Sequence, residues 1–224
     1  MAVNKEKYFE ILEQLKPKGA TLVAVSKIRT VKDILDLYNL GQKDFGENYV
    51  QELVDKQQNL PKDIRWHFIG HLQSNKVKYI APFVHLIHGV DSFKLLKEIN
   101  KQGEKNNRVI NVLLQMHIAQ EETKFGMDEA ELKEIIGSNS NELYQFKNVN
   151  ICGLMGMASF TDDEEKIKKE LRYLKSIFDE YAQLLTANGK LSILSMGMSA
   201  DFKIALEQGS TMVRIGSLLF GARS

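Results

Sequence analysis

The feature that most constrains the fold is an alternation, repeated eight times, of a short apolar segment and a segment of helical periodicity. A short, almost continuously apolar run is typical of a strand covered on both faces, and apolar residues three and four apart are typical of a helix packed against it. Eight such units favour an α/β fold, a closed (β/α)8 TIM-type barrel, over the alternative of an open doubly wound sheet. The predicted strands are centred near residues 22, 44, 67, 86, 112, 153, 193 and 212.

The size and charge of the chain set further limits. Its 224 residues fit one large α/β domain, which we expect to span 1–224. The net charge of +1 gives no support to binding of nucleic acid or of an anionic membrane. Neither a signal core nor an apolar run of the ~20 residues that span a bilayer occurs. Cys152 is the only cysteine, so we expect no disulfide and a soluble cytoplasmic protein.

Two of the predicted helices have defined ends. Thr30 and Asp33 have the spacing of a helix-capping pair. Thr161 and Glu164 are predicted to open the longest helix in the same way, and this helix is expected to end near Gly189.

Near the end of the chain, two consecutive strands are each followed by a glycine turn and a helix start. Ser199 stands at the first start, and Gly216 with Ser217 stands at the second. Free N–H groups at adjacent helix starts favour an anion, and β/α barrels often hold phosphate in the loops after strands seven and eight. Two ordinary turns would also use glycine and serine, but the consecutive pair favours a phosphate site.

A lysine follows the first predicted strand and faces this phosphate site across the barrel. Lys27 would place its ammonium at the barrel mouth, where partial desolvation would lower its pKa and free the amine as a nucleophile. The alternative is a lysine that extends into solvent. A lysine opposite a phosphate site suits pyridoxal phosphate (PLP), and it also suits a Schiff-base aldolase acting on phosphorylated sugars.

Polar residues past the other strands give weaker signals. Asn48 follows the second strand, where its amide could bond a ring substituent or cap the next helix. His67 lies in the third strand and is interpreted as a hydrogen-bonded core residue. No ligand spacing around His67 and His71 matches a metal site, so we expect no metal. Lys124 follows the fifth strand and is a candidate for a second PLP site, with exposure to solvent as the alternative.

Six long motifs occur in order over nearly the whole chain. They are V-A-V-S-K (23–27), F-G-E-N-Y-V-Q-E (45–52), W-H-F-I-G-H-L-Q-S-N-K (66–76), G-L-M-G-M (153–157), L-S-M-G-M-S-A-D-F (194–202) and G-S-T-M-V-R-I-G-S-L-L-F-G-A-R (209–223). Together they resemble the pyridoxal phosphate homeostasis protein family. The departures are Ile28-Arg29, a less usual continuation after the lysine, and the segment 137–149, which matches nothing strongly.

The resemblance implies a single-domain barrel related to the N-terminal domain of the alanine racemases, with fold type III PLP binding. It implies PLP held as an internal aldimine on Lys27. The other cofactor-binding positions that it implies are Asn48 lining the site, Ser199, Gly216 and Ser217 at the phosphate, and Arg214 at the pyridine nitrogen.

Two classes of function fit this resemblance. One is a carrier that buffers or delivers PLP and has no catalytic residue of its own; the other is a PLP-dependent amino-acid racemase or related enzyme. Arg214 can only donate a hydrogen bond, so the pyridine nitrogen would stay unprotonated and the ring would withdraw electrons poorly, although related racemases have the same arginine. Those racemases carry a further β domain with a second acid/base, and we expect this chain to lack it. We therefore favour a monomeric carrier whose partners are PLP and apo PLP-dependent enzymes.

Overall fold

The structure is a computed structural model that describes residues 3–119, 125–136, 146–182, 185–186 and 189–221. The barrel strands are β1 (Thr21–Val25), β2 (Asp44–Glu47), β3 (Arg65–Phe68), β4 (Leu86–Val90), β5 (Ile110–Gln115), β6 (Val149–Met155), β9 (Ile193–Ser195) and β10 (Met212–Ile215). All are parallel and close in the order β1-β10-β9-β6-β5-β4-β3-β2. The closed ring confirms the predicted barrel, and the open doubly wound sheet is wrong.

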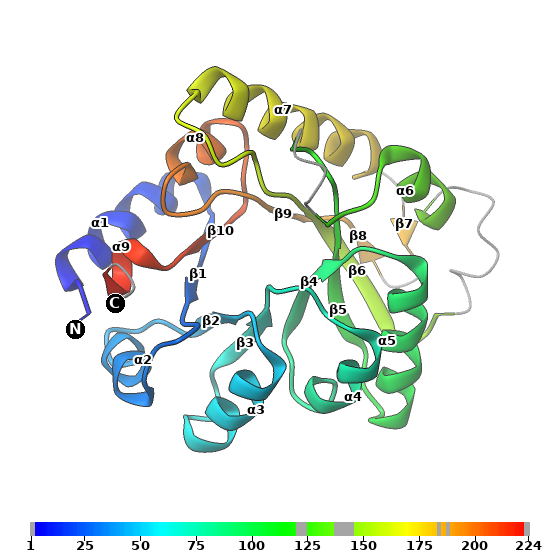
Figure 1. Ribbon diagram of the computed structural model, residues 1–224, viewed down its shortest axis with the longest axis horizontal. Coiled ribbons are helices and arrows are strands. Elements are labelled where there is room, and N and C mark those ends of the chain that lie inside the picture. Colours follow the sequence, from blue (N-terminus) through cyan, green and yellow to red (C-terminus); the bar gives the residue numbers. More distant parts are fainter. Residues whose placement is uncertain (1–2, 120–124, 137–145, 183–184, 187–188, 222–224) are drawn as a thin grey trace.

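Helices surround the ring of strands (Figure 1). Helices lie between consecutive barrel strands along the chain, so each parallel strand starts from the same end of the barrel. The α-helices are α1 (Lys5–Leu15), α2 (Val31–Tyr38), α3 (Val50–Asn59), α4 (Val77–Ile80), α5 (Phe93–Lys105), α6 (Glu129–Ile136), α7 (Glu164–Tyr181), α8 (Phe202–Glu207) and α9 (Ser217–Phe220), with 3-10 helices at Lys16–Lys18 and Ser74–Lys76.

The predicted cap of α2 is confirmed, and that of α7 is wrong. Thr30 and Asp33 form a reciprocal capping box, with each side chain accepting from the backbone N–H of the other residue. Helix α7 is instead capped by Asp163, which accepts from the N–H of Lys166. The hydroxyl of Thr161 accepts from the N–H of Asp163, so it orders the turn that precedes the cap.

The end of α7 also differs from the prediction. The helix ends at Tyr181, well before Gly189. Two short strands follow, β7 (Leu185–Thr186) and β8 (Gly189–Lys190), which pair antiparallel to each other. Leu185 continues the helical spacing of apolar residues, and for that reason the sequence pattern extended the helix too far.

Two local differences affect the end of the barrel that carries the predicted site. Helix α8 begins at Phe202 and not at Ser199, and in the turn before it the carboxylate of Asp201 accepts from the N–H of Met198 at 2.6 Å. Arg214 lies within β10, paired with Val23 of β1, and does not follow the strand.

The two ends of the described chain meet. The N–H of Asn4 donates to the carbonyl of Leu219 at 2.9 Å, so α1 packs beside α9 where the first and last strands pair (Figure 1). Most buried apolar residues lie between the strands and the helices, and a smaller cluster around Val23, Leu113 and Met155 fills the barrel interior. Within the described ranges, no helix combines the length and apolar character that crossing a bilayer requires.

Candidate functional site

A cavity of about 550 Å³ lies at the carboxyl ends of the barrel strands. Its lining comes from segments that follow several strands, as expected for the functional end of a β/α barrel. The six positions predicted from the sequence all line this one cavity, namely Lys27, Asn48, Ser199, Arg214, Gly216 and Ser217. The structure therefore brings together residues that lie far apart in the chain.

The two predicted turns at the phosphate site touch each other. The N–H of Gly216 donates to the hydroxyl of Ser199 at 3.2 Å. A Cβ atom at Gly216 would lie 3.2 Å from the carbonyl oxygen of Val25, so glycine permits the close approach of this turn to β1. Helix α9 begins at the next residue, Ser217, and the first N–H groups of a helix have no partner within it. Backbone N–H groups and hydroxyls thus gather at one side of the cavity.

Asn48 lines the cavity and is partly exposed, with the oxygen of its amide buried. Its Oδ1 atom is buried and has no hydrogen-bond partner among the described residues. The residue that caps α3 is Tyr49, without a side-chain bond, so the alternative role of Asn48 as a helix cap is wrong. An unpartnered buried oxygen costs free energy, and a ligand that donates to it would recover that cost.

Arg214 crosses the barrel interior and is only 4% exposed. Its Nη1 atom donates to the carbonyl and to the hydroxyl of Ser195, at 2.9 and 2.7 Å, and its Nη2 atom donates to the carbonyl of Gly156 at 3.2 Å. Complete burial lowers the pKa of Arg214 to about 10, and the charge of Asp201 opposes this shift. The guanidinium therefore stays charged at neutral pH and offers only donors to the cavity.

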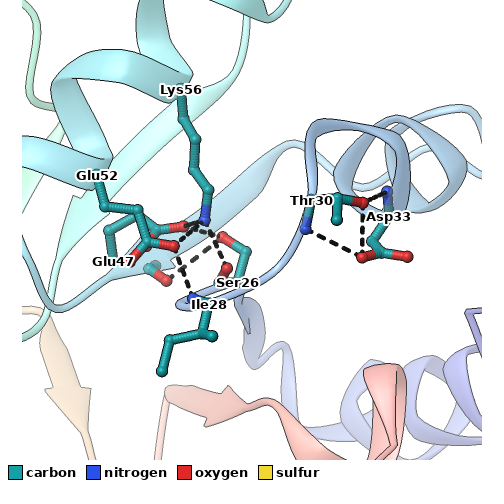
Figure 2. A network of polar contacts seen from close by, with 8 residues as sticks. Ser26, Ile28, Thr30, Asp33, Glu47, Glu52 and Lys56 are labelled. Carbon is teal, nitrogen blue, oxygen red and sulfur yellow. Dashed lines mark hydrogen bonds and ion pairs between the residues drawn. The ribbon is translucent and has the colours of Figure 1, made fainter. Parts of the chain in front are cut away.

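The backbone around Lys27 is held by side chains from the next β/α unit (Figure 2). The hydroxyl of Ser26 donates to Oε1 of Glu47 at 2.6 Å. The N–H of Ile28 donates to Oε1 of Glu52 at 2.6 Å. Ile28 has φ +61°, a left-handed conformation that is rare for a β-branched residue. The two residues that flank Lys27 are thus both fixed by carboxylates.

One ammonium joins these two carboxylates. Lys56, on α3, is 6% exposed, and its Nζ atom donates to Glu47 at 2.7 Å and to Glu52 at 2.6 Å (Figure 2). It also donates to the carbonyl of Ser26 at 2.7 Å. Burial raises the pKa of Glu47, and the nearby charge of Lys56 opposes this shift. Sequence reasoning missed this network, although a glutamate at the end of a buried strand is a signal that could have found it.

The opposite, amino-terminal mouth of the barrel holds a polar cavity of about 410 Å³. His67 is buried there and bonds to Asp44 and His88, so the prediction of a hydrogen-bonded core histidine is confirmed. Oxygen or nitrogen atoms of Asp44, His67 and His85 lie within 4.8 Å of one another, as metal ligands would. Arg65 already contacts both oxygens of Asp44, so a cation would have to compete with it, and the absence of a metal stays a prediction.

The second candidate lysine, Lys124, lies outside the described residues, and its position stays a prediction.

Known protein sequences are similar to this chain over most of its length. The family model described as the N-terminal domain of alanine racemase matches residues 5–224. The chain is 42% identical over 205 residues to the pyridoxal phosphate homeostasis protein of Aquifex aeolicus, covering 91% of this chain and 87% of that protein. It is 35% identical to the protein of the same name from Escherichia coli, with 92% and 87% covered.

Solved structures are also similar to this chain over most of its length. PipY of Synechococcus elongatus, in its structure with PLP bound, superposes with a TM-score of 0.86 at 33% identity, covering 96% of this chain and 99% of that chain. The alanine racemase of Bartonella henselae superposes with a TM-score of 0.73 at 16% identity, covering 96% of this chain and 57% of that chain. The second likeness is one of fold alone.

Proposed function

We propose, from the premise that this chain belongs to the pyridoxal phosphate homeostasis proteins of the alanine racemase N-terminal domain family, that it binds PLP and buffers or delivers it. One observation carries the proposal: the six positions matched to the family motifs line a single cavity at the carboxyl ends of the strands. Its volume lies in the range of small-molecule sites. The homologue PipY has been solved with PLP bound.

Each chemical part of PLP has a suitable group in the cavity. PLP supplies an aldehyde that takes up an amine, a phosphate, a phenolic oxygen and a pyridine nitrogen. Lys27 would hold the aldehyde carbon, and Arg214 would donate to the ring nitrogen. Ser199, Gly216 and Ser217 would hold the phosphate through hydroxyls and N–H groups. The amide of Asn48, whose oxygen is buried and unpartnered among the described residues, would meet a ring substituent.

The charged groups of the cavity support a carrier more than a racemase. A racemase needs two positioned acid/base groups on opposite faces of the substrate carbon. Among the described lining residues the titratable groups are Lys27, Arg29, Asp162, Asp201 and Arg214. Asp201 is already engaged by the N–H of Met198. Arg214, as a permanent donor, cannot act as an acid/base group at neutral pH, although its effect on the ring nitrogen would be the same in a carrier and in a racemase.

The covalent anchor is tested by reduction and peptide mapping. The protein loaded with PLP is treated with borohydride and digested, and we expect the label on the peptide that contains Lys27. Lys27→Ala and Lys27→Arg should both lose the reducible label, because neither side chain supplies a nucleophilic amine. Lys76→Ala, which removes a lysine of a different surface pocket, is the matched control and should keep the label. A full-strength label in Lys27→Ala would refute the assignment of Lys27.

Carrier and enzyme are separated by two measurements on the same preparation. PLP should pass from the loaded protein to an apo PLP-dependent enzyme. Deuterium exchange at Cα of common amino acids should not exceed that of free PLP. Exchange or racemization well above that background, lost in Lys27→Ala, would establish an enzyme. Light scattering of the loaded protein tests the expected monomer.

A further inference from the structure

A line of hydrogen bonds crosses the barrel interior from one mouth to the other. Arg214 Nη1 donates to Ser195 Oγ at 2.7 Å, and Ser195 Oγ lies 3.1 Å from His88 Nδ1. His88 Nε2 lies 2.9 Å from His67 Nδ1, and His67 Nε2 lies 3.0 Å from Asp44 Oδ1. All five residues are buried. The line joins the arginine of the candidate cofactor site to the polar cavity at the amino-terminal mouth.

When both histidines are neutral, the carboxylate at the Asp44 end fixes the direction of every hydrogen bond in the line. Arg214 can only donate, so Ser195 Oγ accepts from it and can still donate its own hydrogen to His88 Nδ1 when that atom carries no proton. A neutral His88 then carries its proton on Nε2 and donates to His67 Nδ1. A neutral His67 likewise carries its proton on Nε2 and donates to Asp44, whose carboxylate only accepts. With both histidines neutral, this is the arrangement that satisfies all four contacts.

The surroundings favour this arrangement. Burial lowers the pKa of His88 well below its usual range, and the positive charge of Arg214 lowers it further. At the far end, burial of Asp44 would raise its pKa, but hydrogen bonds from Arg65 and His67 outweigh this and hold it well below its usual range. His85, at the same mouth, has a pKa lowered mainly by burial. Asp44 at the acceptor end therefore stays ionised and His88 stays neutral near pH 7.

A continuous polar line is unusual in this position. Barrel interiors are normally filled by layers of apolar side chains, and buried polar groups cost free energy unless each finds a partner. Here the line runs beside the apolar interior residues Val23, Leu86 and Met155, where low polarity strengthens hydrogen bonds. The line ends on the one arginine that lines the cofactor cavity from within β10.

We propose that Asp44, His67, His88 and Ser195 form a polarised hydrogen-bond relay that positions Arg214 for the cofactor's ring nitrogen. The inference rests on the proposed function, because it takes the ring nitrogen of PLP as the group that Arg214 meets. Donation of its hydrogen to His88 turns the lone pairs of Ser195 Oγ toward Arg214 Nη1, so the guanidinium is held in one orientation. These four residues are positioning residues, and no proton has to move along the relay.

The first test needs no cofactor. The full chain is labelled with 15N, and the imidazole nitrogens of His67 and His88 are assigned by long-range 15N–1H correlation at pH 7 to 8. Both rings should be neutral with the proton on Nε2. A proton on Nδ1 of either ring, or an imidazolium at His67, would overturn the relay as drawn.

The second test measures the bound cofactor. In Asp44→Asn and in Ser195→Ala, the affinity for PLP should fall about three- to ten-fold, the effect of one net hydrogen bond. The absorbance maximum of bound PLP should also shift, because the donor at its ring nitrogen is held differently. His85→Gln changes a histidine of the same mouth outside the relay and should match the wild type in both readouts. A role confined to packing would lower stability and leave the absorbance unchanged.

The two proposals fail in different ways. If wild-type protein takes up no PLP on Lys27, the proposed function fails, and the NMR measurement still decides whether the relay exists. If the wild type binds PLP and both variants keep its affinity and absorbance, the positioning role is refuted. His88→Gln serves as the third relay variant if either of the others does not fold, with a circular dichroism spectrum as the check.

Discussion

The backbone N–H of Ile28 donates a 2.6 Å hydrogen bond to Oε1 of Glu52, twenty-four residues further along the chain. This contact holds Ile28 at φ +61° and thereby fixes the direction in which the preceding residue, Lys27, leaves β1. A left-handed conformation costs a non-glycine residue roughly 1–2 kcal/mol. The structure therefore keeps a strained residue beside its candidate nucleophile, and strain of this kind is concentrated at functional sites.

Replacing the strained residue should stabilise the protein. Ile28→Gly removes the left-handed penalty, and the side chain is 66% exposed, so little packing is lost. After the entropy that glycine adds to the unfolded chain, we expect a gain of about 0.5–1 kcal/mol in the free energy of unfolding. Chemical denaturation measures it. Val31→Gly, at a neighbouring β-branched residue that begins α2, should destabilise; equal losses in both variants would mean that Ile28 stores no strain.

Removing the central ammonium of the network should be much more costly. Lys56→Met leaves the carboxylates of Glu47 and Glu52 near each other, with Glu47 fully buried. Breaking a buried ion pair on one side typically costs about 3–5 kcal/mol. Lys56→Met combined with Glu47→Gln should recover part of that loss, because no buried charge is left unpaired. Thermal unfolding of the three proteins checks this; a double variant no more stable than Lys56→Met would contradict it.

The phosphate site makes a prediction about ligand chemistry. Ser199→Ala removes a hydroxyl that lies against the N–H of Gly216 in the cavity. Losing one charge-assisted contact costs on the order of 1.5–3 kcal/mol, so PLP affinity should fall roughly ten-fold or more. Affinity for pyridoxal, which has no phosphate, should be weak and nearly unchanged by the substitution. The control is Ser159→Ala, in the same cavity, whose hydroxyl donates to Glu170. Equal affinities of the wild type for pyridoxal and PLP would remove the phosphate site.

The buried histidine predicts a pH dependence of stability. The pKa of His88 in the folded protein lies well below 6.5 because of its burial. As the pH falls through about 6.5, the unfolded chain takes up a proton that the folded protein does not. The free energy of unfolding should therefore fall by about 1.4 kcal/mol per pH unit below that point. Denaturation between pH 7.5 and 5 should show this slope reduced in His88→Gln, whereas His71→Gln, at an exposed histidine, should retain it.

The sequence was sufficient for the architecture because the strand and helix periodicities are local properties. Eight apolar runs predicted eight barrel strands, and the capping pair at Thr30 predicted the start of α2. The errors lie where tertiary contacts decide a boundary. A turn in which Asp201 bonds to Met198 precedes α8, and Asp163 rather than Thr161 caps α7.

The residues of the candidate site also divide into those that the sequence predicts and those that only the folded structure shows. Residues that face the cavity could be predicted, because they follow strand ends and match the family motifs. The groups behind them could not, since nothing local links Lys56 to Ser26 or His88 to Ser195. Those pairs lie 30 and 107 residues apart, and only the closed barrel brings them together. A buried charge within a strand pattern, as at Glu47, marks where to search for such partners.

The pairing of β1 with β10 has a consequence for synthesis of the chain. Lys27 follows the first strand and Arg214 lies in the last, and the two strands are neighbours because the barrel closes between them. At typical elongation rates, the ribosome adds Arg214 roughly ten seconds or more after it has added Lys27. Until then the nascent chain contains only part of the residues that line the candidate PLP cavity. Binding of PLP is therefore expected after translation, in a molecule whose barrel has already closed.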